Sequence, residues 1–222
     1  MFKNKSTNRF FLKIILFWII AFIHSPIYGN QTNDWGIKAG ASISNQYYDY
    51  KSFDIERHFD HYIGFSIDIF NNTFHSDHVE LISQLSYIRK GCTEELYSTY
   101  VDLSSPQGYA SGGKIKLINR IDYISIAILS KLYIDLKGFE PYVFFGPRFD
   151  YPFKTKSIST TIYNNIKNNW GISVGFGCEF PFIFSNRMLV EFQYSPDLNE
   201  IYKTKALSIR KSSYEVKLGI IF

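Results

Sequence analysis

The sequence predicts an all-β fold: a closed eight-stranded antiparallel up-and-down transmembrane β-barrel, preceded by an N-terminal signal peptide. Three observations predict it. Apolar residues alternate with polar or small ones in eight segments, the connections between these segments alternate between short and long, and most glycines of the segments lie on the polar side. Successive side chains of a strand point to opposite faces, so each segment has one apolar face and one polar face.

The first 29 residues have the features of a secretory signal peptide. Basic residues precede an apolar run at 10–22, and the small residue Gly29 follows it. Because the run is short for a bilayer span, we expect cleavage near Gly29, with an uncleaved N-terminal anchor as the alternative. The predicted organisation is a signal peptide at 1–29, a short segment at 30–33 and a barrel domain at 34–222.

Charge and cysteine content argue against two classes of function. Four of the 24 basic residues lie in the signal peptide, which leaves 20 against 20 acidic residues, so no basic excess predicts nucleic-acid binding. The two cysteines, Cys92 and Cys178, fall near opposite ends of the predicted strands, on the order of 20 Å apart and beyond disulfide reach. Both are expected to be free and structural rather than redox-active.

The alternation is clearest in four segments: "WGIKAGASI" (35–43), "YIGFSIDIF" (62–70), "WGISVGFGCEF" (170–180) and "YEVKLGIIF" (214–222). We expect the last segment to pair with the first and to close the cylinder, since its apolar face then needs only lipid to cover it. Four further segments alternate less regularly: 79–91, 122–134, 141–153 and 187–195. The segment at 122–134 is nearly all apolar, so its facing stays open.

The predicted connections differ in length. Short turns are expected at 71–77, 135–140 and 181–186. Long polar loops are expected at 45–58, 92–116, 153–167 and 197–208. Short turns at one end and long loops at the other are typical of outer-membrane barrels.

A secreted β-sandwich is the alternative fold, because its strands alternate as well. Its polar face would meet bulk water, where glycine weakens a strand. Here eight of the fourteen glycines lie on the polar face and suit a crowded lumen: Gly36, Gly40, Gly64, Gly146, Gly171, Gly175, Gly177 and Gly219. The apolar face carries aromatic residues near strand ends, as in an interfacial girdle: Trp35, Tyr151, Trp170, Tyr194 and Phe222.

Seven stretches carry a resemblance to a known family: "WGIKAGASISN", "QLSYIRKG", "IDYISIAIL", "FEPYVFFGPRFDY", "WGISVGFGCEF", "VEFQYSPDLNEI" and "KLGIIF". In this order they resemble the PorT-like outer membrane β-barrel family of Bacteroidetes, over residues 34–222. The family pattern Y-x-E-I-P is replaced here by "YISIAI" at 123–128, which leaves the subgroup open. The resemblance implies a bacterial outer-membrane location, a terminal aromatic residue read by the insertion machinery, and a possible accessory role in type IX protein secretion.

An eight-stranded barrel has a lumen just wide enough for side chains to fill. Nine charged residues are expected to point into it: Lys38, Asp68, Glu80, Arg148, Asp150, Glu179, Glu191, Glu215 and Lys217. Buried charges need partners, so we expect a compensating ion-pair network and small or no conductance. A proton or ion path, hence a small-solute channel, is the alternative.

Two candidate functional sites, a histidine metal site and a lipid-modifying site, have little support in the sequence. The histidine pairs "HFDH" (His58, His61) and "HSDH" (His75, His78) have no completing ligands, so no metal or other cofactor is expected. A lipid-modifying site would need His61 in contact with Ser83 or Ser125, and nothing in the sequence brings them together. We therefore expect no catalytic, cofactor-binding or metal-binding residues, with a lipid-modifying enzyme as the alternative.

The sequence thus predicts a monomeric, non-enzymatic barrel in the outer membrane. Its expected partners are the membrane lipid and the insertion machinery during biogenesis. A further candidate partner is a protein that docks on the Tyr- and Ser-rich loop at 92–116 or on the periplasmic turns. Two roles stay open: an envelope or surface-interaction barrel, and an accessory component of type IX-like secretion.

Overall fold

The structure is a computed structural model that describes residues 34–50, 60–76, 78–101, 109–156, 167–182, 186–203 and 207–222. Its strands are β1 (Trp35–Tyr50), β2 (Asp60–Ser76), β3 (Val79–Val101), β4 (Tyr109–Tyr133), β5 (Glu140–Lys156), β6 (Asn169–Pro181), β7 (Arg187–Pro196), β8 (Tyr202–Lys203) and β9 (Leu207–Ile221). Among the described residues no helix is long and apolar enough to cross a bilayer. The predicted signal peptide and the segment at 30–33 lie outside them.

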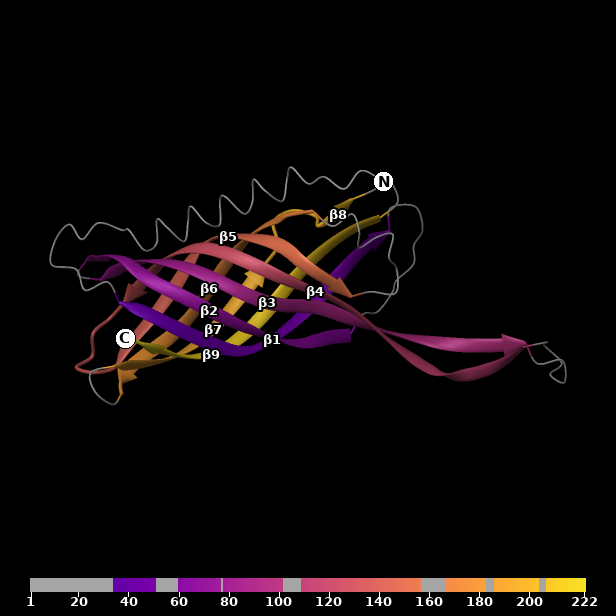
Figure 1. Cartoon of the computed structure of the whole chain (residues 1–222), viewed down its shortest axis with the longest axis horizontal. Helices are drawn as coiled ribbons and strands as arrows, with labels where there is room; N and C mark the ends of the chain where they lie inside the picture. The colour runs from indigo at the N-terminus through magenta and orange to yellow at the C-terminus, as the bar shows by residue number, and fades with distance from the viewer. Residues whose placement is uncertain are drawn as a thin grey trace.

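Eight of the strands form a closed ring in which each is antiparallel to its neighbours (Figure 1). They pair in chain order, and β1 pairs with β9 from Gly36↔Ile221 to Tyr50↔Leu207, which closes the ring. The short β8 pairs with β9 beyond the end of β7. At the closure, the Phe222 amide donates a hydrogen bond to the Trp35 carbonyl at 2.8 Å. The predicted eight-stranded up-and-down barrel is confirmed.

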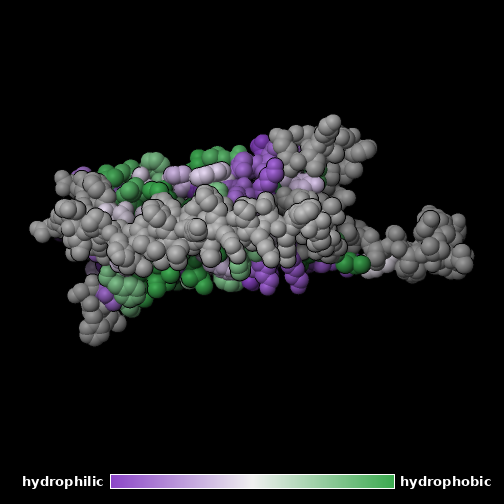
Figure 2. Space-filling view, turned by 45° about the horizontal axis from the view of Figure 1, so that its top comes forward, coloured by the Kyte–Doolittle hydropathy of each residue, from purple (hydrophilic) through white to green (hydrophobic). Residues whose placement is uncertain are grey.

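The two faces of the ring differ as the alternation predicts. Apolar side chains of the outer face are half exposed, such as Ile67 (46%), Phe176 (57%) and Leu218 (56%), whereas inner positions are buried and mostly polar. In β4, whose facing the sequence leaves open, Ser125 is buried in the lumen and Ile128 is exposed outside. Figure 2 shows hydrophobic side chains over the body of the barrel and a group of hydrophilic ones toward the end from which β3 and β4 project.

The inward glycines are explained by a close approach of neighbouring strands. A Cβ atom on Gly40 would lie 1.8 Å from the carbonyl oxygen of Val216, and one on Gly146 would lie 2.0 Å from that of Ile128. Both distances are far below van der Waals contact. Any larger residue would therefore push two strands of the wall apart.

The predicted long loop at 92–116 is wrong for most of its length. β3 and β4 stay paired from Val79↔Leu132 to Val101↔Tyr109, with one register shift, and they project from the ring as a two-stranded hairpin (Figure 1). Beyond the bilayer both faces of a ribbon meet water, so the hydrophobic alternation that marks a membrane strand is not required there. The residues from Thr93 to Val101 are instead rich in strand-forming Thr, Tyr and Val.

The other connections are also shorter than predicted. β1 continues to Tyr50 and β5 to Lys156, and the predicted loop at 197–208 contains β8. The predicted turn at 71–77 is wrong as well, because β2 continues to Ser76. Its Asn71 and Asn72 resemble a turn signal, but both are buried, and Asn72 Nδ2 donates to Glu80 Oε2 at 3.3 Å. The predicted turns at 135–140 and 181–186 are confirmed to within a residue.

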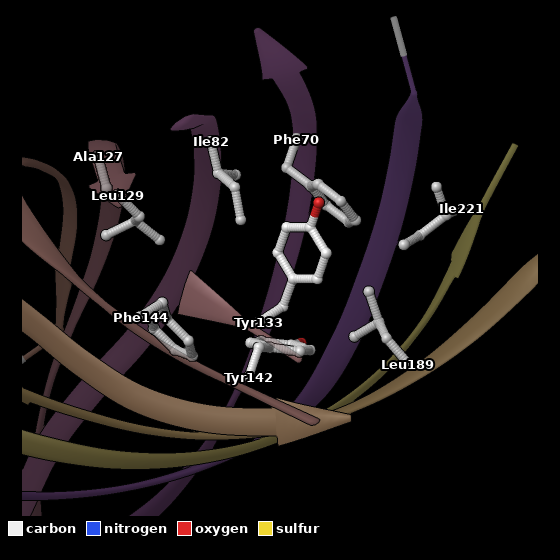
Figure 3. Close-up of a cluster of buried hydrophobic side chains, with 9 residues drawn as sticks. All are labelled: Phe70, Ile82, Ala127, Leu129, Tyr133, Tyr142, Phe144, Leu189 and Ile221. Atoms are coloured by element: carbon white, nitrogen blue, oxygen red, sulfur yellow. The ribbon is translucent and has the colours of Figure 1, made fainter. Parts of the chain in front are cut away.

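Among the described residues, an apolar cluster lies in the interior near the short-turn end of the ring (Figure 3). It consists of Phe70, Ile82, Ala127, Leu129, Tyr133, Tyr142, Phe144, Leu189 and Ile221. The rings of Tyr142 and Phe144 lie with centroids 6.2 Å apart. These side chains occupy the lumen where a pore would need space.

Candidate functional site

The lumen contains all nine charged residues that are predicted to point inward. Each is at most 3% exposed: Lys38, Asp68, Glu80, Arg148, Asp150, Glu179, Glu191, Glu215 and Lys217. Lys90, Lys131 and Lys211 are equally buried, although the sequence pattern does not single them out. The inward position of Lys90 could have been predicted, because it lies an even number of residues from Glu80 and so on the polar face of 79–91.

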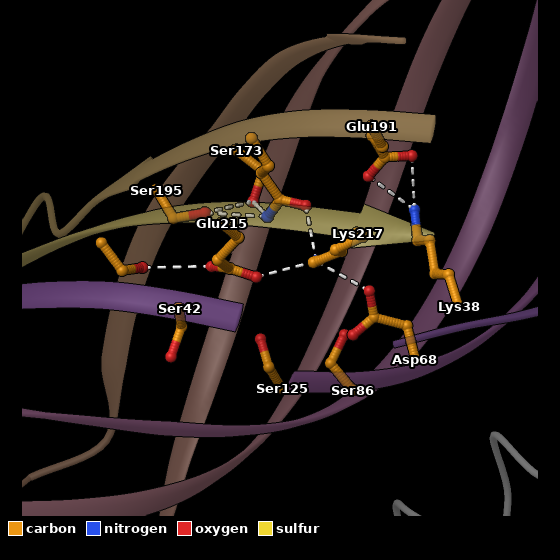
Figure 4. Close-up of polar contacts among 12 residues, drawn as sticks. Lys38, Ser42, Asp68, Ser86, Ser125, Ser173, Glu191, Ser195, Glu215 and Lys217 are labelled. Carbon is orange, nitrogen blue, oxygen red and sulfur yellow. Dashed lines mark hydrogen bonds and ion pairs between the residues drawn. The ribbon is translucent and has the colours of Figure 1, made fainter. Parts of the chain in front are cut away.

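The middle of the lumen is organised around Lys217 (Figure 4). Its Nζ lies 2.7 Å from Asp68 Oδ2 and 2.8 Å from Glu215 Oε2, and it donates to Gln193 Oε1 at 2.9 Å. The Ser213 hydroxyl donates to the other oxygen of Glu215 at 3.1 Å. The Lys217 ammonium group thus forms ion pairs with two carboxylates from different strands. Such pairing offsets the cost of burying these charges.

Lys38 connects this centre to the apolar cluster. Its Nζ lies 2.8 Å from both carboxylate oxygens of Glu191. The Tyr142 hydroxyl also donates to Glu191, at 3.2 Å. Lys38 Nζ stands 5.1 Å from the ring centre of Phe70 and 5.8 Å from that of Phe144, within the range of cation–π attraction.

A second group of charges closes the short-turn end. Lys131 Nζ lies 2.8 Å from Glu80 and 2.5 Å from Glu179. Arg187 lies 2.9 Å from Glu179 and 3.3 Å from Glu140, and it also pairs with Asp34. Arg187 is partly exposed, so this group runs from the interior to the rim.

A third group fills the end nearer the hairpin. Arg148 lies 2.9 Å from Asp150 and 3.1 Å from Asp197. Lys90 reaches Asp150 at 3.2 Å, and the Ser125 hydroxyl donates to the same carboxylate at 2.5 Å. The interior therefore contains ion pairs along its length, with cations and carboxylates side by side, which matches the compensating network that the sequence predicts.

The structure does not bring the weak catalytic candidates together. Ser125 donates to Asp150 inside the lumen, which decides the facing that the sequence leaves open for 122–134. Ser83 is opposite Ile128 in the β3–β4 ladder. His61 is exposed at the start of β2.

The structure describes one histidine of each pair fully, His61 and His78. His78 is in the turn after β2, at the opposite end of that strand from His61. His58 and the side chain of His75 lie outside the described residues. Within the described ranges no group of three or more His, Cys, Asp and Glu residues is arranged to hold a metal ion. Cys92 and Cys178 are both free, as predicted.

Several solved structures resemble this one at low sequence identity. Neisserial surface protein A matches with a TM-score of 0.46 and 10% identity, over 86% of this chain and 100% of that chain. The outer membrane protease OmpT of Escherichia coli matches with a TM-score of 0.47 and 10% identity, over 89% and 98%. Ail of Yersinia pestis, in complex with the heparin analogue sucrose octasulfate, matches with a TM-score of 0.41 and 12% identity, over 86% and 100%. No curated protein matches the chain.

The sequence comparison is more decisive. The model of the outer membrane protein beta-barrel domain matches residues 29–203, which is most of the chain. This match agrees with the closed antiparallel ring and with its apolar outer face. The protein is located in the bacterial outer membrane. The chain belongs to the outer membrane protein beta-barrel domain family.

Proposed function

We propose that the protein is a monomeric, non-enzymatic envelope barrel that binds a protein partner through the β3–β4 hairpin. The hairpin here means the part of β3 and β4 that projects from the ring, residues 94–101 and 109–119. The observation that carries the proposal is the pairing of these strands. Within the described residues, β2 pairs with β3 only as far as Thr93, and β5 pairs with β4 only from Arg120.

Beyond these points neither of the described neighbouring strands, β2 and β5, pairs with an outer edge of the hairpin. A two-stranded ribbon is marginally stable alone in water, and an open edge is a template for a further strand. The exposed side chains of the hairpin are mixed, with Lys114 and Lys116 beside Ile115 (50% exposed) and Ile118 (46%). An extended segment of a partner that adds a strand to one edge fits this surface best.

The filled lumen supports the non-enzymatic, non-channel part of the proposal. Its charges are occupied with one another, and its apolar cluster blocks the short-turn end. Neither a small-solute channel nor a lipid-modifying enzyme receives similar support. The insertion machinery of the outer membrane remains a partner during biogenesis only.

A second role follows from the resemblance to PorT-like barrels of Bacteroidetes. In that case the partner is a component of type IX-like secretion. The specific observation is the ordered series of strand motifs through residues 34–222. A deletion strain distinguishes the two roles, because a block in secretion of C-terminally tagged cargo supports the second role and intact secretion removes it.

Site-specific photo-crosslinking in intact cells tests the hairpin. A crosslinking amino acid at Glu95 or Lys116 should yield a discrete adduct with a protein, whereas the same group at Arg210 should not. Arg210 is exposed at the same end of the barrel but on β9. A variant with the hairpin shortened to a tight turn after Glu94 should still fold and should lose the partner. Equal adducts from Arg210, or none from the hairpin, would contradict the proposal.

A further inference from the structure

The outer wall of β3, β4 and β5 carries a group of charged residues that is distinct from the three groups in the lumen. We propose that this group, here called the rim cluster, binds the phosphate groups of lipids in the outer leaflet. The rim cluster consists of Arg89, Arg120, Asp122, Lys154 and Lys156. It is separate from the hairpin, and its ligand is a lipid rather than a protein.

Asp122 organises the cluster. Its Oδ1 accepts from Arg89 Nε at 3.1 Å and lies 3.3 Å from Arg120 Nε. The β-ladders place Arg89 and Lys154 directly opposite Asp122, one on each side. Directly opposed residues of an antiparallel pair project from the same face, about 5 Å apart at Cβ. The arginines and Lys154 therefore stand around one carboxylate on the outside of the barrel.

The cluster contains more positive charge than its own carboxylate neutralises. Asp122 is the one acid of the cluster: Arg89 and Arg120 contact it, and Lys154 is its ladder partner. The fourth cation, Lys156, is directly opposite Arg120 in the ladder. Like charges in opposed positions destabilise a strand pair. The lumen shows the contrary arrangement, in which cations and carboxylates are matched in contact. A bound anion would remove the repulsion of the rim cluster, and a phosphate group suits two arginine guanidinium groups because each presents a planar fork of donors.

The location of the cluster selects a lipid phosphate over a free one. The next outward positions toward the bilayer are apolar or aromatic: Tyr87 on β3, Ile124 on β4 and Tyr151 on β5. The Arg89 guanidinium carbon stands 4.7 Å from the ring centre of Phe65, and Arg89 Nη2 donates to the Tyr87 hydroxyl at 3.4 Å. The cations therefore begin where the lipid-facing band ends, at the depth of the headgroups.

Binding to defined lipids tests the proposal on the unmodified protein. The folded chain in dodecyl maltoside micelles, which contain no phosphate, is titrated with diphosphoryl lipid A, with the same lipid after removal of its phosphates, and with inorganic phosphate. Bound molecules are counted by native mass spectrometry. We expect retention of diphosphoryl lipid A only. Equal binding of the dephosphorylated lipid would overturn the proposal, and so would equally tight binding of inorganic phosphate.

Charge-removing variants locate the site. Arg120→Gln, Lys154→Gln and Lys156→Gln together should weaken binding of diphosphoryl lipid A on the order of 100-fold, about fivefold for each cation. The matched control is Lys137→Gln, Lys167→Gln and Arg210→Gln, which removes three exposed cations elsewhere and should leave affinity unchanged. An equal loss in the control would overturn the location. Folding of each variant is checked by its heat-dependent gel shift, and Lys156→Gln alone replaces the triple variant if that one does not fold.

Discussion

Lys217 and Asp68 meet inside the barrel with their charged atoms 2.7 Å apart, and neither side chain is exposed to solvent (0% each). They belong to β9 and β2, which are separated by β1 in the ring. The contact therefore spans the interior between strands that share no backbone hydrogen bonds. It depends on the closure of the ring and on the stagger of the strands.

Replacing Lys217 with Met should strongly destabilise the barrel. The change leaves Asp68 and Glu215 buried with no shared cation, which costs about 3–5 kcal/mol for a broken buried pair. Urea unfolding of the refolded protein in detergent or vesicles, followed by tryptophan fluorescence, measures the loss. The control Lys167→Met alters an exposed lysine and should leave the midpoint unchanged. Partial recovery is expected when Asp68→Asn and Glu215→Gln are added, since the orphaned charges are then removed.

The purified protein should show small or no conductance in planar bilayers. Its lumen is occupied by ion pairs and by the apolar cluster around Tyr142 and Phe144. Single-channel recording checks this at several salt concentrations. Steady large current steps in preparations of verified purity would be incompatible with the filled lumen.

Gly40→Ala should impair folding, whereas Gly113→Ala should be tolerated. A Cβ atom at Gly40 would lie 1.8 Å from the Val216 carbonyl oxygen, while nothing lies within 4 Å of one at Gly113. Overpacking costs typically about 1–3 kcal/mol even where the surroundings relax, and here the obstacle is backbone. The folded fraction after refolding, read from the heat-dependent gel shift, compares the two variants. Equal yields would mean that the strands do not approach each other as closely as the structure shows.

The two cysteines should differ in their access to reagents. Cys92 is buried in the lumen (0% exposed), whereas Cys178 is partly exposed on the lipid-facing side of β6. A membrane-soluble maleimide should therefore label Cys178 in the folded barrel and label Cys92 only after unfolding. Mass spectrometry of the labelled peptides gives the ratio. Rapid labelling of Cys92 in the folded state would place it outside the lumen.

The facing of the lumen residues could be predicted because a strand has a period of two. Once Glu215 and Lys217 are assigned to the polar face, their inward position follows from local sequence alone. Which charges contact one another could not be predicted, since pairs such as Lys38 and Glu191 join strands that are far apart in sequence. Those contacts depend on the stagger between strands, which alternation does not encode.

The β3–β4 hairpin and the rim cluster were harder to predict for a different reason. Alternation marks strands only where one face meets lipid, so it stops near Arg89 while the backbone pairing continues to Val101. To predict the rim cluster, one must know which residues are opposite Asp122 in the β-ladders. One of them is Lys154, which follows a register shift in the pairing of β4 with β5. A bulge of this kind changes which residues are neighbours without leaving a clear pattern in the sequence.

The pairing of β1 with β9 determines when the barrel can form. The first and last strands must hydrogen-bond along their whole length, so the seam brings together residues on the order of 180 positions apart, and such long loops close slowly. Until β9 is present, the edge of β1 that pairs with it has no partner strand. A chain that lacked β9 would leave one edge of β1 and one edge of β7 without a partner strand, and such edges can pair with other chains.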